Sequence, residues 1–153
     1  MYKTIRTNSD NPDFQKLVIE LDKDLTIRDG DDHSFYDQFN KIDAIKYVIV
    51  IYENENPVGC GAIKEYENKI AEVKRMFVDI NQRGKGIASQ VLTELEKWAS
   101  ELGYEKCILE TGKMQPEAIS LYKKNNYTII KNYGQYADVD NSVCFEKELK
   151  SLS

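Results

Sequence analysis

Histidine is almost missing from this chain, and cysteine is scarce. The single histidine, His33, stands in an acidic stretch, and the cysteines Cys60, Cys107 and Cys144 are far apart in apolar surroundings. A nucleophilic cysteine needs a histidine partner, and a metal clip needs closely spaced ligands. We therefore expect buried, reduced thiols, a solvated His33 and no metal ion.

Excess positive charge and long apolar runs are also lacking. The chain has 21 Lys and Arg against 26 Asp and Glu, so its formal net charge is −5. A nucleic-acid binder needs a basic footprint, which this balance does not provide. No apolar run reaches the length of a membrane span, and residues 1–6 form a strand pattern, not an apolar signal segment. We expect a cytoplasmic protein with neither nucleic acid nor membrane among its partners.

The length and composition of the chain agree with those of one compact enzyme. It has 153 residues, of which 41% are hydrophobic and 31% are charged. This length suits one domain with a core of its own. Because no repeat, low-complexity segment or linker interrupts the sequence, we expect a single domain over residues 1–153.

The segment RGKGIA, residues 83–88, is the most informative stretch of the chain. It follows a strand-like run and opens the strongest helical pattern. Glycines such as Gly84 and Gly86 let the backbone bend tightly, and the first N–H groups of a helix have no internal partner. With Arg83 and Lys85 beside them, these N–H groups predict a site for a pyrophosphate. An ordinary glycine-containing turn with solvated basic residues is the alternative.

Two common phosphate motifs do not fit this segment. A P-loop needs Lys and Ser or Thr after its second Gly, but Gly86 is followed by Ile87 and Ala88. A dinucleotide fingerprint needs a third Gly at position 89, which is Ser89. The pattern that does fit is R-x-x-G-x-A, at Arg83, Gly86 and Ala88.

The second half of the chain adds another motif. Apolar residues recur at three- and four-residue steps from Ile87 to Leu102, which predicts a helix that ends at Gly103. A short strand over 107–109 precedes a second helix with Pro116 at its first position. This second helix carries A-x-x-L-Y-x-K-x-x-Y over residues 118–127, with Asn126 where a left-handed C-cap is needed.

These two motifs, in this order, resemble those of the GNAT superfamily of acyl-CoA N-acyltransferases. The resemblance runs from about residue 71 to 149, and Asn126 replaces the Gly that is usual there. It implies a three-layer α/β fold, with a mixed, mostly antiparallel sheet, helices on both faces, and splayed fourth and fifth strands. The residue patterns agree with the element order β-α-α-β-β-β-α-β-α-β-β. They place strands over 2–6, 47–52, 58–64, 71–78, 107–109, 127–130 and 142–148, and a short helix around 35–39.

The resemblance also implies the reaction, which is direct transfer of an acetyl group from acetyl-CoA to a primary amine of a small molecule. Acetylation of a protein N-terminus or lysine, and a non-catalytic acyl-CoA sensor, are the alternatives, and a homodimer is left open. The implied cofactor-binding residues lie in the fourth strand, in the turn and helix start, and near the fifth strand. They are Met76, Phe77, Val78, Arg83, Gly84, Lys85, Gly86, Ile87, Ala88, Ser89 and Thr111.

Two residues are candidates for proton transfer. Tyr122 occupies the family's tyrosine position, and its phenol can protonate the leaving thiolate. Glu72, in the strand that contacts the thioester, is the candidate base, acting through water. Arg75 lies on the opposite strand parity unless a bulge intervenes, and it either pairs with a nearby acid or binds a substrate carboxylate.

Acidic residues suggest a cationic acceptor. The segment between the first two strands and the late loop, which in this family wall the acceptor pocket, carry several aspartates. A cleft lined by one sign of charge attracts ligands of the other sign. Solvated loop residues and helix caps are the alternative. The aspartates are Asp22, Asp24, Asp29, Asp31, Asp32, Asp138 and Asp140.

Overall fold

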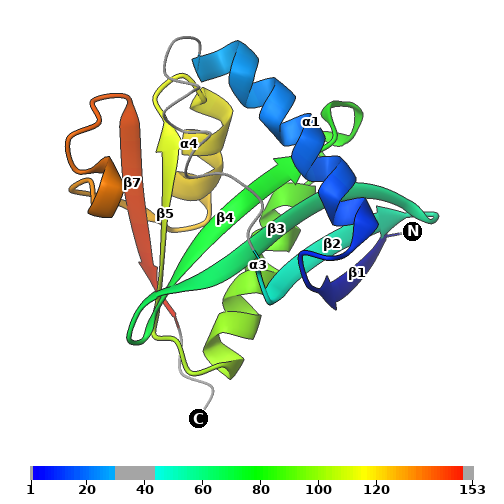
Figure 1. The fold of residues 1–153 in the computed structure, drawn as a ribbon, viewed down its shortest axis with the longest axis horizontal. Helices are drawn as coiled ribbons and strands as arrows, with labels where there is room; N and C mark the ends of the chain where they lie inside the picture. Colours follow the sequence, from blue (N-terminus) through cyan, green and yellow to red (C-terminus); the bar gives the residue numbers. More distant parts are fainter. Residues whose placement is uncertain (1, 30–43, 150–153) are drawn as a thin grey trace.

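A computed structural model describes residues 2–29 and 44–149. Seven strands form one sheet: β1 (Tyr2–Thr7), β2 (Tyr47–Glu53), β3 (Asn56–Glu67), β4 (Ile70–Val78), β5 (Lys106–Gly112), β6 (Thr128–Ile130) and β7 (Ser142–Glu148). Their order in the sheet is β1-β2-β3-β4-β5-β7-β6, and every neighbouring pair is antiparallel except β4–β5 (Figure 1). The helices are α1 (Pro12–Asp29), α3 (Ile87–Glu101) and α4 (Pro116–Lys124), with short 3-10 turns η2 (Ile80–Gln82) and η3 (Gly134–Tyr136).

Helix α1 covers one face of the sheet. It begins where Asn11 Oδ1 accepts hydrogen bonds from the backbone N–H groups of Asp13 and Phe14, at 2.8 and 3.0 Å. Pro12 takes the first helical position, where its missing N–H costs nothing. Phe14 and Val18 are fully buried against β2 and β3. The cap and the apolar stripe together hold α1 against this face.

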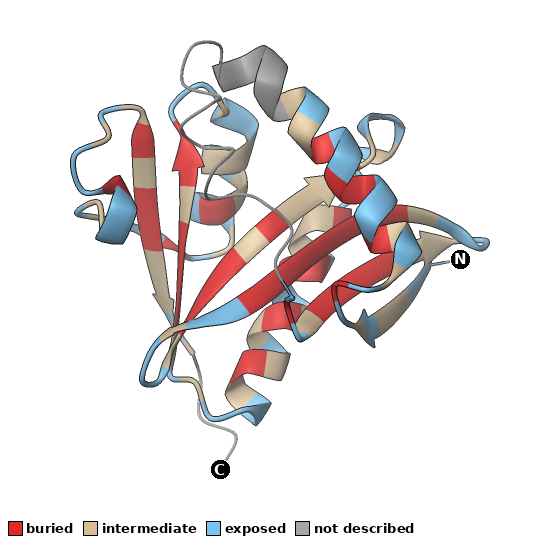
Figure 2. Cartoon of the chain, in the orientation of Figure 1, coloured by how far each residue is buried: buried red, intermediate tan, exposed pale blue. Residues whose placement is uncertain are grey.

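Helix α3 packs on the opposite face, so the fold has three layers (Figure 1). Its buried side chains recur at helical spacing, and Gly103 follows its end with a φ of 94°. Tyr122 of α4 joins the same core. Figure 2 shows buried residues along the central strands and along the sheet-facing sides of the helices. The buried residues of α3 are Ile87, Val91, Leu92, Leu95 and Ala99.

Strands β4 and β5 pair only over their first few residues. The register joins Ile70 to Lys106, Ala71 to Cys107, and Glu72 to Ile108. Beyond these pairs the two strands separate toward their carboxyl ends (Figure 1). The splay expected for the fourth and fifth strands is therefore present, and it opens the middle of the sheet.

A β-bulge interrupts β4 next to this opening. Cys60 pairs with Phe77 and Ala62 pairs with Lys74, so one residue of β3 faces two residues of β4. Arg75 takes a φ of 61°, which is unusual for a residue other than glycine. The bulge turns Met76 toward the α3 face and Phe77 toward the α1 face.

Several sequence predictions can be compared directly with the fold. Asn126 has the left-handed backbone that its C-cap position requires, with a φ of 72°. Helix α1 continues to Asp29, and β3 runs over 56–67, longer than the 58–64 expected because the hairpin pairing extends to both ends of the strand. The short helix around 35–39 and His33 lie outside the described residues.

The three cysteines are buried free thiols, as expected. Burial raises the pKa of the Cys60 and Cys107 thiols to about 12 and that of Cys144 to about 11. Within residues 2–29 and 44–149, no group of three or more His, Cys, Asp or Glu side chains could hold a metal ion. No helix of this described part is long and apolar enough to cross a membrane.

Candidate active site

A cleft of about 460 Å³ lies where β4, the turn before α3, and α4 meet. Most of the residues predicted to bind a cofactor line it together. They are Met76, Phe77, Val78, Arg83, Gly84, Gly86, Ile87, Ala88 and Ser89. The opposite wall comes from α4, through residues such as Ala118, Leu121 and Tyr122.

The glycine turn gives the cleft an open, electropositive end. Gly84 and Gly86 have φ values of 82° and 81°, and a Cβ added at either would have no heavy atom within 4 Å. Gly86 is the N-cap of α3 and supplies no side-chain cap. The first N–H groups of α3 therefore have no intrahelical acceptor and lie at the positive end of the helix dipole. This is the local chemistry of an anion site.

Arg83 is held in place at this end of the cleft. Its Nε donates to the carbonyl oxygen of Val78 at 3.0 Å, and its guanidinium lies 5.5 Å from the Phe77 ring centroid. Its Nη2 lies 3.8 Å from Oδ2 of Asp24. Lys85 donates to Gln82 at 3.1 Å and does not line the cleft. Of the two predicted cations, the structure places only Arg83 in the cleft wall.

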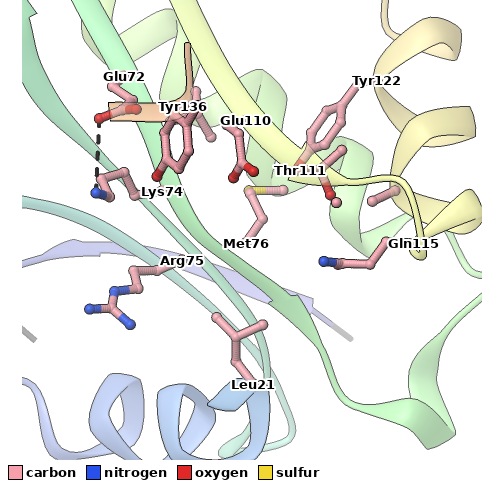
Figure 3. A pocket seen from close by; sticks show the side chains of 13 residues that line it. Leu21, Glu72, Lys74, Arg75, Met76, Glu110, Thr111, Gln115, Tyr122 and Tyr136 are labelled. Carbon is pink, nitrogen blue, oxygen red and sulfur yellow. Dashed lines mark ion pairs between the residues drawn. The ribbon is translucent and has the colours of Figure 1, made fainter. Parts of the chain in front are cut away.

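A smaller cavity of about 110 Å³, which we call the inner cavity, adjoins the cleft. It occupies the opening between β4 and β5, and Met76, Gln115 and Tyr122 line both spaces. Figure 3 shows its polar side chains, which come from β4, β5, the start and first turns of α4, and the η3 turn. They are Glu72, Lys74, Arg75, Glu110, Thr111, Gln115, Tyr122 and Tyr136. Thr111, predicted to contact the cofactor, lies in this cavity and not in the cleft.

Tyr122 stands at the junction of the two spaces. It is 6% exposed, and its ring packs against the rings of Tyr127 and Phe145 at centroid distances of 5.9 and 5.7 Å. Among the described residues, its hydroxyl has no hydrogen-bond partner. Burial, and then the charge of Glu110, raise the pKa of this phenol. The Tyr122 phenol therefore keeps its proton and can act as a hydrogen-bond donor.

Glu72 is held by two partners. The hydroxyl of Tyr133 donates to its Oε2 at 2.6 Å, and Nζ of Lys74 lies 3.9 Å from its Oε1. Burial, and then the charge of Glu72, raise the pKa of Tyr133, which therefore keeps its proton and remains a donor. The carboxylate is 8% exposed and lines the inner cavity.

Glu110, Tyr133 and Tyr136 were missed by the sequence analysis. Ser142 donates to Oε2 of Glu110 at 2.6 Å, and the Tyr133 and Tyr136 rings meet edge-on at 5.8 Å. Glu110 directly precedes Thr111 at the end of a predicted strand, and this position could have marked it. The two tyrosines belong to a late loop that carries no local signal of its function.

Two of the aspartates taken as acceptor-binding groups pair with arginines. Asp22 lies 3.8 Å from Nη1 of Arg75, and Asp24 pairs with Arg83. The bulge thus places Arg75 beside an acid, in agreement with the charge-pair interpretation. Asp138 and Asp140 are exposed and line neither cavity. The structure does not describe the side chain of residue 29 or any part of residues 31 and 32.

Comparison with protein families places this site in a known context. The family model described as Acetyltransferase (GNAT) family matches residues 13–127. An uncharacterised N-acetyltransferase of Bacillus subtilis (strain 168) is 34% identical over 100 residues, covering 64% of this chain and 66% of that protein. An IAA acetyltransferase of Azospirillum brasilense is 39% identical over 93 residues, covering 60% of this chain and 61% of that protein. The matches thus span less than two thirds of these two relatives.

Solved structures share the whole architecture. A Klebsiella pneumoniae protein classed as an acyl-CoA N-acyltransferase superposes with a TM-score of 0.82 at 26% identity, covering 98% of this chain and 99% of that one. A GNAT family acetyltransferase from Elizabethkingia anophelis, solved with acetyl-CoA bound, superposes with a TM-score of 0.71 at 17% identity. That superposition covers 97% of this chain and 98% of the other.

Proposed function

Because this chain belongs to the GNAT family of acetyltransferases, we propose that it transfers an acetyl group from acetyl-CoA directly to the primary amine of a small molecule. One observation carries the proposal. The cleft and the inner cavity meet at Tyr122, a buried residue that lines both spaces. A long cosubstrate in one space and a small acceptor in the other would come together at this proton donor.

The cleft fits the cosubstrate in size and in chemistry. Its volume of about 460 Å³ is within the range of small-molecule sites. The N–H groups at the start of α3 and the Arg83 guanidinium would hold the pyrophosphate. Backbone groups of Met76, Phe77 and Val78, next to the splay, would hold the pantetheine and polarise the thioester carbonyl. Acetyl-CoA, when bound, supplies an activated acetyl group.

The proposed chemistry needs two proton transfers, and a different side chain carries out each of them. The acceptor arrives as an ammonium and must lose a proton, which Glu72 accepts through water. The amine nitrogen then bonds to the carbonyl carbon, and the carbon–sulfur bond breaks. Tyr122 donates its proton to the departing sulfur, consistent with its position at the junction of the two spaces. Tyr133 positions Glu72, since it donates to this carboxylate at 2.6 Å.

We also propose that residues 1–153 form a single N-acetyltransferase domain that works in the cytoplasm. The match to the family model, residues 13–127, supports one domain. Three buried free thiols are consistent with a reducing compartment.

Binding and turnover, measured separately, test the proposal. Calorimetry with acetyl-CoA should give saturable binding, and a panel of small primary amines should give free thiol at a rate that depends on amine concentration. Binding without turnover on any amine or lysine peptide would identify a sensor. Turnover with peptides alone would instead identify the protein as a protein acetyltransferase.

A further inference from the structure

The cleft and the inner cavity join at a partly apolar junction. The residues that line both spaces are Leu21, Met76, Gln115, Ala118 and Tyr122. The backbone of β4 at this point would polarise the thioester carbonyl, so the acyl group of the cosubstrate would lie in the junction. The inner cavity beyond it is lined by two carboxylates and two cations, against which an apolar chain is poorly placed. A longer acyl chain would therefore have to extend along the apolar residues of the junction.

The bulge in β4 places Met76 opposite a glycine of β3. Gly61 is the single β3 residue that faces Arg75 and Met76. Because Gly61 has no side chain, the space above it is free for Met76: a Cβ built on Gly61 would lie 2.6 Å from Sδ of Met76. The same Cβ would lie 2.7 Å from Cγ1 of Val91 and 2.9 Å from Cδ1 of Leu95. The recess above Gly61 is thus walled by α3 and occupied by the Met76 thioether.

Met76 reaches from the junction into this recess, since it lines both spaces and its sulfur lies over Gly61. Val91 and Leu95 behind it are fully buried, and Met76 packs against the same core. Protein interiors are close-packed, so an acyl chain that reaches Met76 can extend no further unless the thioether gives way. Removing the Met76 side chain would leave an apolar pocket with Gly61 at its floor, open to the junction.

We infer that Met76 selects the acyl group, limiting the cosubstrate to short chains such as acetyl, and that Gly61 sets how deep the Met76 side chain lies. This inference rests on the proposed function and names a specificity-determining residue of the same site. The bond that forms and the bond that breaks are those of acetyl transfer, and only the length of the acyl chain is selected.

Matched variants test the roles of Met76 and Gly61. Met76→Ala opens the recess, and Met76→Leu refills it with a side chain of similar volume. Gly61→Ala adds a methyl group that would push the Met76 sulfur toward the junction. One control is Met114→Ala, because Met114 is 61% exposed and lines neither space. The other is Gly59→Ala, whose added Cβ would have Cγ2 of Ile87 as its nearest atom, at 2.7 Å. Should Met76→Ala not fold, Met76→Val opens part of the recess instead.

Each variant is measured with acetyl-CoA, propionyl-CoA and butyryl-CoA. Calorimetry gives the Kd of each acyl-CoA without an acceptor. Release of free thiol, with propylamine, ethylenediamine and glycine as the amines, gives kcat/KM. The quantity compared is the ratio of butyryl-CoA to acetyl-CoA within one variant, so that a loss of folded protein affects both values equally. Thermal melts show that each variant is folded.

The wild type should prefer acetyl-CoA to butyryl-CoA. One methylene in an apolar pocket changes specificity roughly ten- to two-hundredfold, so Met76→Ala should raise the butyryl-to-acetyl ratio roughly tenfold or more, in affinity and in kcat/KM. Met76→Leu and both controls should keep the wild-type ratio. Gly61→Ala should lower kcat/KM with acetyl-CoA. Combined with Met76→Ala, it should reduce the gain with butyryl-CoA, because its methyl group fills part of the recess.

Three results would overturn the inference while leaving acetyl transfer intact. These are a wild-type preference for butyryl-CoA, an unchanged ratio in folded Met76→Ala or Met76→Val, and an equal change of ratio in either control. If Met76→Ala changes the relative affinities as expected but no variant acylates any amine, the proposed function fails and the acyl pocket stands. If the wild type binds no acyl-CoA, both fail.

Discussion

The glycine turn before α3 offers a sharp test of cosubstrate binding through the substitution Gly86→Trp. Gly86 lines the cleft, and a Cβ there would meet nothing within 4 Å, so the indole would project into open space at the start of α3. Gly103 provides a matched control at the other end of the same helix. It too has a left-handed φ, 94°, and nothing within 4 Å of an added Cβ, and it does not line the cleft.

The two variants should cost similar stability and differ in binding. A residue with a Cβ in the left-handed region costs about 1–2 kcal/mol, which predicts a similar, modest fall in Tm for Gly86→Trp and Gly103→Trp. An indole over the first turn of α3 displaces the pyrophosphate from its N–H groups. Losing two hydrogen bonds to a charged group at about 1.5 kcal/mol each weakens binding roughly a hundredfold or more.

Isothermal calorimetry with acetyl-CoA on both folded variants decides the matter. The expected result is a large loss of affinity in Gly86→Trp and wild-type affinity in Gly103→Trp, with similar thermal melts. Unchanged affinity in Gly86→Trp would show that the pyrophosphate does not sit at this turn. Equal losses in both variants would attribute the effect to strain in α3.

Three further substitutions test the roles of other side chains. Tyr122→Phe should lower kcat by roughly ten- to ten-thousandfold, with acetyl-CoA affinity unchanged by calorimetry, because only a general acid is lost. Tyr133→Phe should lower kcat in the wild type and have little further effect on Glu72→Gln, since Tyr133 acts through that carboxylate; additive losses in this double-mutant cycle would refute the positioning role. Asn11→Ala should cost about 1 kcal/mol in urea unfolding and leave kcat unchanged, because it removes the cap of α1.

Local chemistry was enough to predict most of the elements and the cofactor turn. The apolar spacing from Ile87 onward gives α3 its buried face, and Asn11 with Pro12 begins α1. Gly86 and Asn126 are residue types that accept the left-handed backbone found at both positions. These features depend on residues only a few positions apart in the sequence, so residue types and their spacing are enough to predict them.

The acceptor side of the site depends on contacts between distant parts of the chain. Tyr133 reaches Glu72 across 61 positions, and β4 meets β5 only after the whole of α3 has intervened. The bulge at Arg75 appears only when β3 and β4 are paired, because it is a mismatch between two strands. Nothing near Glu110 in the sequence shows that it will face Glu72 across a splayed sheet. Residue types and short-range spacing thus determined the family, the helices and the anion turn, whereas strand pairing and loop closure decided which charges share the inner cavity.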